Sequence, residues 1–262
     1  MHEHTEDSWR GLRVMVSAGA SGIGLAIAQA FARAGARVHI SDIAAGPLAT
    51  ASETLPGGGA CVADASDAVA VEAWFRTALA DLGGLDVLVN NAGIAGPTAG
   101  IENIEPAQWD QVMAVNLRSQ FLCTRLAVPA LRQSGRGVII NLSSVAGRLG
   151  YPLRTPYAAS KWAVVGLTQS LALELGGDDI TVNAILPGIV DSERSRTVTE
   201  TKARARGVSV AEQEALILGN VALHRKVPLQ DVAATALFLA SPAGRSFTGQ
   251  NFNVCAGIQT LI

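Results

Sequence analysis

Hydrophobic residues follow two alternating patterns along the chain. Short runs rich in valine, isoleucine and leucine are typical of strands buried on both faces of a parallel sheet. Longer segments between them carry apolar residues at helical spacing. The predicted strands are Leu12–Ser17, Ala36–Asp42, Ala60–Ala63, Leu85–Asn90, Gly137–Ser143, Ile180–Leu186 and Gln250–Val254. The predicted helices are Ile23–Ala34, Ala68–Leu82, Pro106–Gln133, Tyr157–Leu175 and Pro228–Leu239, with Pro106 and Pro228 suited to first-turn positions.

This alternation predicts an α/β fold: a Rossmann-like, doubly wound parallel sheet with helices on both faces. No linker or charge block interrupts it, so residues 1–262 are expected to form a single domain. The stretch from Val14 to Ala32 has no charged residue and resembles a membrane span by hydropathy. Glycines at positions 19, 22 and 24 instead divide it into a strand, a turn and a helix.

Residues 191–226 depart from the alternation, because this segment is polar, rich in arginine and follows the sixth predicted strand. In open α/β sheets, ligands bind at the carboxyl ends of the strands. The segment is therefore interpreted as a helical lid over a substrate. The alternative is a solvated surface excursion.

Composition excludes several classes of protein. The chain has 262 residues, of which 49% are hydrophobic and 16% charged, with a net charge of −2. Such a chain can bury a large core, and it lacks the basic excess of a nucleic-acid-binding protein. The polar stretch Met1–Arg10 does not resemble a secretory signal, so a cytoplasmic location without membrane attachment is expected. The three cysteines and four histidines have no spacing typical of a disulfide framework or a metal site, so no metal is expected.

A glycine-rich loop joins the first strand to the first helix, with the sequence Ser17-Ala18-Gly19-Ala20-Ser21-Gly22-Ile23-Gly24. Backbone N–H groups at a helix N-terminus bind pyrophosphate, and glycines allow the close approach that this requires. Asp42 ends the second strand, where a carboxylate can accept hydrogen bonds from both ribose hydroxyls and repel a 2′-phosphate. The loop and the acid together favour NAD(H) over NADP(H). The alternative is that Asp42 only caps the next helix.

The sequence resembles the short-chain dehydrogenase/reductase superfamily over nearly its whole length. Ser17, Gly22 and Gly24 match the superfamily's Thr-Gly-x-x-x-Gly-x-Gly motif, in which Ala18 replaces the first glycine. Further motifs follow in order at Asn90-Asn91-Ala92-Gly93, Asn141-Leu142-Ser143-Ser144 and Pro187-Gly188, and Asp64 matches the acid that contacts adenine. The resemblance implies cofactor contacts from Ser17, Gly19, Ser21, Gly22, Ile23, Gly24, Asp42, Ile43, Asp64, Ala65, Asn91, Ala92, Gly93, Tyr157, Lys161, Pro187, Gly188 and Val190.

Tyr157 and Lys161 lie four residues apart on a predicted helix and therefore share one face. A nearby ammonium stabilises a phenolate, which lets a tyrosine act as an acid or base. Ser144 precedes Tyr157 by thirteen residues, which matches the superfamily's catalytic spacing. The resemblance implies that Tyr157 is the acid/base, that Lys161 supports it and contacts ribose, that Ser144 polarises the substrate oxygen, and that Asn116 distorts its helix and supports a proton relay.

Arginines surround the expected reaction centre. A guanidinium pairs with a carboxylate in bidentate fashion, so the favoured substrate is small, polar and acidic, for instance a keto-deoxy sugar acid. The alternative is that these charges lie on solvated helix faces. The candidate substrate residues are Ser144, Arg148, Tyr151, Arg154, Tyr157 and Arg194.

The predicted activity is NAD-dependent interconversion of a secondary alcohol and a ketone. Two alternatives stay open: a 3-oxoacyl-thioester or other carbonyl reductase, and a catalytically silent NAD-binding regulatory protein. The apolar tail, Cys255 to Ile262, is expected to pack against a neighbouring subunit. The resemblance implies a homotetramer joined through the helix carrying Tyr157 and through the last strand.

Overall fold

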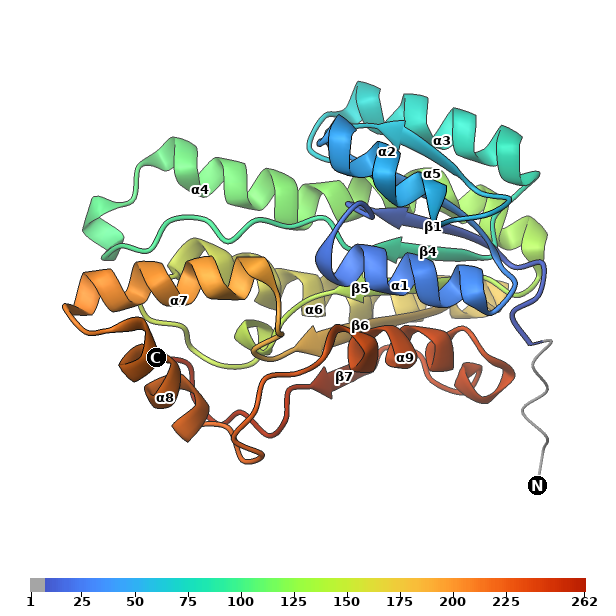
Figure 1. Cartoon of the computed structure of the whole chain (residues 1–262). Coiled ribbons are helices and arrows are strands. Elements are labelled where there is room, and N and C mark those ends of the chain that lie inside the picture. The colour runs from blue at the N-terminus through green and yellow to red at the C-terminus, as the bar shows by residue number, and fades with distance from the viewer. Residues whose placement is uncertain (1–7) are drawn as a thin grey trace.

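The computed structural model describes residues 8–262 of the chain. His2, His4 and most of the Met1–Arg10 stretch, used above to argue against a metal site and a secretory signal, lie outside this range. Seven parallel strands form one sheet in the order β3-β2-β1-β4-β5-β6-β7 (Figure 1). The strands are β1 (Arg13–Ser17), β2 (Arg37–Asp42), β3 (Gly59–Val62), β4 (Val87–Asn90), β5 (Val138–Leu142), β6 (Thr181–Pro187) and β7 (Asn251–Val254). The predicted α/β fold class is confirmed, and each predicted strand is present.

Nine α-helices connect and cover the strands within the described residues. They are α1 (Gly22–Arg33), α2 (Ala45–Glu53), α3 (Ala68–Leu82), α4 (Pro106–Met113), α5 (Ser119–Ser134), α6 (Thr155–Leu175), α7 (Glu193–Arg206), α8 (Val210–Gly219) and α9 (Leu229–Leu239). Helix α2 has no counterpart among the predicted helices, because its small residues carry no clear apolar period. Pro106 occupies the first turn of α4 as expected, whereas Pro228 is the residue immediately before α9.

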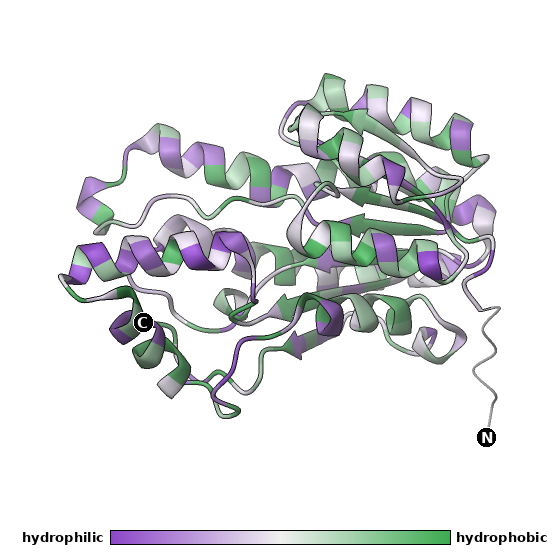
Figure 2. Cartoon of the chain, in the orientation of Figure 1, coloured by the Kyte–Doolittle hydropathy of each residue, from purple (hydrophilic) through white to green (hydrophobic). Residues whose placement is uncertain are grey.

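Two buried layers explain why the sheet needs helices on both sides. On one face, Val14, Val16 and Ile40 pack with Phe31 of α1 and Ala236 of α9. On the other face, side chains of the intervening strand positions pack against α3, α5 and α6. Successive strand residues point to opposite faces, so the unbroken apolar runs in the sequence feed both layers. Green accordingly predominates along the central strands of the sheet (Figure 2).

The carboxyl ends of the strands share one edge of the sheet, and α7 and α8 lie beyond that edge (Figure 1). The winding reverses between β1 and β4, which are neighbours in the sheet although two strands separate them in sequence. Such a reversal opens a crevice at the carboxyl ends of the strands. No helix among the described residues is long and apolar enough to cross a membrane.

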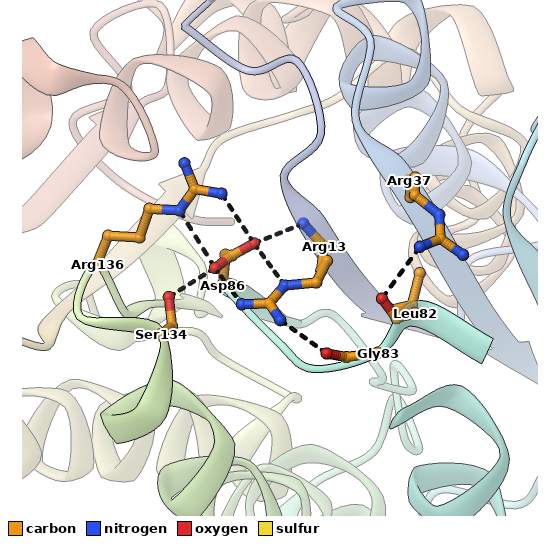
Figure 3. A network of polar contacts seen from close by, with 7 residues as sticks. All are labelled: Arg13, Arg37, Leu82, Gly83, Asp86, Ser134 and Arg136. Carbon is orange, nitrogen blue, oxygen red and sulfur yellow. Dashed lines mark hydrogen bonds and ion pairs between the residues drawn. The ribbon is translucent and has the colours of Figure 1, made fainter. Parts of the chain in front are cut away.

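The amino ends of the strands are held by a network around Asp86, which is fully buried (Figure 3). Its carboxylate accepts bonds from the backbone N–H and the guanidinium of Arg13 at 2.8–3.0 Å. Ser134 Oγ donates at 2.6 Å, and Arg136 adds two longer bonds. These partners hold the pKa of Asp86 well below its usual range, against the opposing effect of burial. The network joins β1, the start of β4 and the end of α5.

Candidate active site

A cavity lies where the carboxyl ends of the central strands meet α6, α7 and α8. The sheet edge contributes Asn91 and Gly93 after β4, Ser144 after β5, and Pro187 and Gly188 at the end of β6. Tyr157 and Lys161 face the same cavity from α6. The segment predicted as a lid contributes α7 and α8 to its outer wall. Residues distant in sequence thus converge because parallel strands all end at one edge.

Lys161 is buried beneath Tyr157. Its Nζ donates to the carbonyl oxygen of Leu142 at 2.8 Å and lies 5.8 Å from the centre of the Tyr157 ring. Its residue is only 4% exposed. Burial, with a smaller contribution from the charge of Arg194, lowers the pKa of Lys161 to about 7. Near neutral pH, this ammonium therefore gains from any negative charge that develops beside it.

The Ser144 hydroxyl is also oriented by the backbone. Its Oγ accepts a bond from the N–H of Ala146 at 3.1 Å, as the cap of the short 3₁₀ turn Val145–Gly147. A hydroxyl has one proton to donate in addition to its acceptor lone pairs. Ser144 can therefore donate that proton to a ligand oxygen in the cavity while the cap bond persists.

Asn116 sits in a π-helical turn, Ala114–Arg118, between α4 and α5. The single helix expected over Pro106–Gln133 is therefore interrupted at this residue. The Asn116 carboxamide accepts from the N–H of Ile94 at 2.7 Å and donates to Ile94 O and to Ser160 Oγ at 3.0–3.1 Å. Such a bulge widens the helix locally. It turns the buried carboxamide of Asn116 toward Ile94, in the loop that follows β4. Nothing in the sequence marked Ser160 as part of this arrangement.

The glycine loop fits a bound dinucleotide. A Cβ atom added at Gly24 would collide with the carbonyl oxygen of Ala18 and with the Asn91 carboxamide, so this position requires glycine. Gly22 adopts a left-handed φ of 52°, with open space around the place where a Cβ would lie. The N-cap residue Ser21 makes no side-chain capping bond to the first-turn N–H groups of α1. The N-terminus of α1 is thus open to an anion, as pyrophosphate binding requires.

Ala18 is the one departure from the glycine motif, and it is strained. Its φ is 51°, in the left-handed region that glycine enters without cost. Asn91 holds this turn by donating from Nδ2 to the carbonyl oxygens of Ser17 and Ala18 at 2.9–3.1 Å. Ser17 Oγ accepts from the N–H groups of Asn91 and Ala92, which ties β1 to the end of β4. These bonds keep the loop in the shape that the motif's first glycine would otherwise favour.

Asp42 connects the glycine loop to the end of β2. Its two carboxylate oxygens accept from the N–H of Ala20 at 3.2 Å and from the N–H of Ala44 at 3.1 Å. Helix α2 begins only at Ala45, and its N-cap is Ala44, so Asp42 is not the cap residue. Asp64, after β3, accepts from the N–H and Oγ of Ser66. The two acids therefore follow the neighbouring strands β2 and β3, and Asp42 contacts the glycine loop.

Tyr151, Arg154 and Arg194 line the cavity, but Arg148 does not. The Arg148 side chain turns to the tail, where it donates to the carbonyl oxygen of Ile258 at 3.2 Å. The structure therefore does not place Arg148 with the other predicted substrate residues at the cavity. The residue follows the 3₁₀ turn after β5, and this turn directs it away from the reaction centre.

Arg154 is the most unusual cation of the site. Its residue is 3% exposed, and it lies 5.4 Å from the ring centre of Tyr157. One of its terminal nitrogens donates to the carbonyl oxygen of Ala95, whereas its buried Nε has no hydrogen-bond partner. No described residue that lines the cavity is an aspartate or a glutamate. A buried guanidinium without an acidic partner is costly, and an anionic ligand would compensate it.

Several cavity residues were not predicted from the sequence. Ile189, Val198, Ile217 and Leu261 form an apolar part of the wall. Behind them, Lys202 lies 4.1 Å from the ring centre of Tyr151, and burial, then the charges of Arg154 and Arg206, lower its pKa to about 8. The unusually apolar tail was the available signal for Leu261. The chain itself buries Ile258 and Leu261 of this tail.

Comparisons with known proteins agree with this geometry. Residues 17–259 match the family described as enoyl-(acyl carrier protein) reductase. D-β-hydroxybutyrate dehydrogenase from Cupriavidus necator is 36% identical over 252 residues, which span 94% of this chain and 97% of that protein. An actinorhodin polyketide ketoreductase variant solved with NADPH has a TM-score of 0.90 at 32% identity, covering 97% of this chain and 98% of that one. An NAD⁺-bound xylitol dehydrogenase has a TM-score of 0.91 at 25% identity, covering 95% and 99%.

Proposed function

Because the chain belongs to the short-chain dehydrogenase/reductase superfamily and is an oxidoreductase of CH–OH groups, we propose that it transfers hydride between NAD(H) and a small acidic secondary alcohol or ketone. A keto-deoxy sugar acid is one such substrate. The observation that carries this proposal is the convergence of Tyr157, Lys161 and Ser144 on a cavity whose buried Arg154 has no acidic partner.

In the oxidative direction, the Tyr157 oxygen accepts the hydroxyl proton of the alcohol. Lys161, held by its bond to the Leu142 carbonyl, stabilises the phenolate form of Tyr157 electrostatically. Ser144 donates its free proton to the substrate oxygen. The negative partial charge on that oxygen grows when the alcohol loses its proton or when the carbonyl is attacked. NAD, when bound, supplies the hydride acceptor or donor, and the protein supplies orientation and electrostatics.

Asn116 supports proton movement behind this pair. A Cβ atom at Gly93 would lie 3.4 Å from both Asn116 Oδ1 and Lys161 Nζ, so the space between those atoms is open because residue 93 has no side chain. A water in this space would connect Lys161 to the carbonyl oxygen of Ile94, which Asn116 holds in place. Asn116 thus acts as a positioning residue for the relay.

The preference for NAD(H) rests on Asp42. Its carboxylate is held at the glycine loop by two backbone N–H groups, where it would accept bonds from ribose hydroxyls. The same negative charge would repel the 2′-phosphate of NADP(H). This charge also argues against the alternative of a 3-oxoacyl-thioester reductase dependent on NADPH. The complete set of Asn116, Ser144, Tyr157 and Lys161 argues against a catalytically silent NAD-binding protein.

The proposal extends to assembly and location. Trp162 and Leu173 are large apolar side chains exposed on α6, the helix through which the superfamily commonly forms tetramers. Their exposure supports a homotetramer that uses α6 and β7. A cytoplasmic location accords with the reduced state of Cys61, Cys123 and Cys255, which are free thiols.

The test measures NADH or NADPH formation at 340 nm with either cofactor. The substrate panel covers sugar acids and deoxy-keto acids, neutral polyols, hydroxyacyl thioesters and sterols. Turnover of acids with NAD⁺ is expected. Preference for thioesters, sterols or NADP⁺ would overturn the substrate or cofactor proposal.

A paired variant tests the role of Arg154. Arg154→Met should raise KM for an acidic substrate by about 10- to 100-fold, the value of a lost charged hydrogen bond, and should change KM for an uncharged alcohol much less. The control is Arg196→Ala, which removes an exposed arginine of α7 that does not line the cavity. Equal effects of Arg154→Met on both substrates would refute carboxylate recognition by this residue.

A further inference from the structure

One part of the cavity wall consists of apolar side chains from four separate segments. Ile189 follows β6, Val198 belongs to α7, Ile217 belongs to α8, and Leu261 belongs to the tail. Ile217 and Leu261 are both buried. A polyhydroxylated chain placed against such a wall would lose hydrogen bonds to water without replacement, whereas an alkyl group would gain from burial.

The hydroxyls of α7 and of its N-cap residue add few hydrogen-bonding groups to this apolar wall. Ser192 Oγ already accepts from the N–H of Ser195 as the helix cap. Thr199 donates its hydroxyl proton to the carbonyl oxygen of Ser195 at 2.9 Å. The hydroxyls of Ser192 and Ser195 each keep a proton, so two donors remain for substrate oxygens on this side.

A second, smaller cavity adjoins this one, and Leu261 belongs to the wall that the two share. Tyr151, Ile189, Ile217 and Leu261 line both cavities, and the smaller one extends toward Lys202 and Ile262. Leu261 is the only one of the four that the tail supplies. Loss of its side chain would therefore join the two spaces and lengthen the pocket.

Several polar contacts hold the tail in this position. Lys202 Nζ, on α7, donates to the backbone oxygen of Ile262. The N–H of Gln259 donates to the carbonyl oxygen of Asn220 at 3.1 Å, and Arg148 donates to that of Ile258. The contact from Lys202 adjoins Leu261 directly, so α7 fixes the residue that ends the pocket.

We propose that Leu261, held by Lys202 through Ile262, is the end wall of the substrate pocket and restricts it to acids whose other substituent is a short alkyl group. This inference rests on the proposed function, because it takes the carboxylate to lie at Arg154. It narrows the substrate class from hydroxylated acids in general to short aliphatic hydroxy or oxo acids. Lys202 is a positioning residue for this wall.

Binding of unreactive ligands tests the wall without requiring turnover. Dissociation constants of linear saturated carboxylates from butanoate to octanoate would be measured by calorimetry with the enzyme–NADH complex. The wild-type protein should bind the short acids and lose affinity as the chain lengthens. Leu261→Ala should move the optimum to longer chains, with a gain of about fourfold for each methylene that enters the joined space.

Further variants distinguish the effect of the Leu261 side chain, the effect of the Lys202 contact and nonspecific effects of truncating a side chain. Lys202→Met should reproduce part of the Leu261→Ala shift, and Lys202→Arg should restore the wild-type profile. Leu216→Ala, which truncates a leucine that is 48% exposed on α8 and lines neither cavity, should leave the profile unchanged. The inference is overturned if Leu261→Ala keeps the wild-type profile, if Leu216→Ala shifts it equally, or if no carboxylate binds.

Failure of the proposed function would give a different experimental result from failure of this inference. In that case, no secondary alcohol of the panel would be oxidised with NAD⁺, while the change in chain-length profile caused by Leu261→Ala would still be measured by calorimetry.

Discussion

Buried charges at the two ends of the parallel sheet differ in whether the chain supplies them with partners of opposite charge. At the amino end, Asp86 is buried and surrounded by the guanidinium groups of Arg13 and Arg136 and by the Ser134 hydroxyl. At the carboxyl end, Lys161 and Arg154 are equally buried, but they bond to backbone carbonyls rather than to acids. The first arrangement is complete within the folded chain, whereas the second leaves positive charge for a ligand to neutralise.

The carboxyl end of the sheet also contains backbone strain. Ala18, in the glycine loop at the carboxyl end, occupies a left-handed conformation that costs a non-glycine residue roughly 1–2 kcal/mol. Strain and unpaired polar groups persist at functional sites because the surrounding structure tolerates them and ligand binding uses them. The comparison therefore separates an end that maintains the fold from an end that performs chemistry, and variants at each end should have separable effects.

The largest expected effect is the loss of turnover in Tyr157→Phe. Removal of the hydroxyl removes the proposed acid/base, so kcat should fall by about 10²–10⁴-fold. The phenyl ring keeps the packing with Tyr151, so the free energy of unfolding and the Kd for NADH should change little. Steady-state kinetics, denaturant unfolding and NADH fluorescence titration measure these three quantities. Substantial residual kcat would contradict the assignment of Tyr157.

Asp86→Ala should have the opposite phenotype. It leaves Arg13 and Arg136 without their acceptor, and breaking a buried ion pair typically costs about 3–5 kcal/mol. We expect the lower part of this range, because both arginines are partly exposed. Urea unfolding measures the loss, and kcat per folded enzyme should stay unchanged below the transition.

A matched control for that variant is Asp178→Ala, which removes the partly exposed pair with Arg132. Such surface pairs contribute about 0–1 kcal/mol, so this variant should unfold nearly as the wild type does. If Asp86→Ala lowered kcat of the folded enzyme as strongly as it lowered stability, the separation of the two ends would not hold.

The smallest expected effect is a pH dependence of stability that originates at Lys161. Its pKa is lowered to about 7 in the folded cofactor-free protein, against an ordinary value of 10.5. Between these values the unfolded chain binds more protons, so this residue makes the unfolding free energy rise with pH, by at most about 1.4 kcal/mol per unit. Lys161→Met should therefore lack this part of the rise from pH 7 to pH 9.

Urea unfolding at pH 7, 8 and 9 compares the two proteins without cofactor. Lys202, whose pKa is lowered to about 8, contributes to both and cancels in the difference. The wild-type curve should be steeper than the Lys161→Met curve. Parallel curves would show that burial of Lys161 does not oppose its charge. Asp86 affects stability at low pH instead. Because the fold lowers the pKa of this carboxyl, its contribution to the free energy of unfolding is lost only as the pH falls below the ordinary value of 3.8.

Much of the fold could be predicted because its signals are local. Apolar runs marked the strands, glycines marked the turn after β1, and strand–helix alternation implied a parallel sheet. Helix α2 was missed because its small residues carry no apolar period. The interruption at Asn116 could not be read from local spacing alone, since a π-helical turn depends on packing of the amide against Ile94 and Ser160.

Some residues of the candidate site could likewise be predicted from the sequence, and others could not. Tyr157, Lys161 and Ser144 could be named in advance because their spacing matches the motif of the superfamily that the sequence resembles. The substrate wall could not, because Ile189, Val198, Ile217 and Leu261 come from four segments with no shared pattern. Arg148 illustrates the converse: its place in the sequence suggested substrate contact, but its guanidinium bonds to the tail.

The sequence by itself determined the order of strands and helices, the glycine loop and the set of polar residues at the strand ends, because each depends on neighbouring residues or a short repeat. The tertiary structure alone decided which cations enter the cavity, which acid at the opposite end is neutralised, and where the tail lies. Those outcomes depend on long-range packing and on the loss of water around each charge, which no local pattern records.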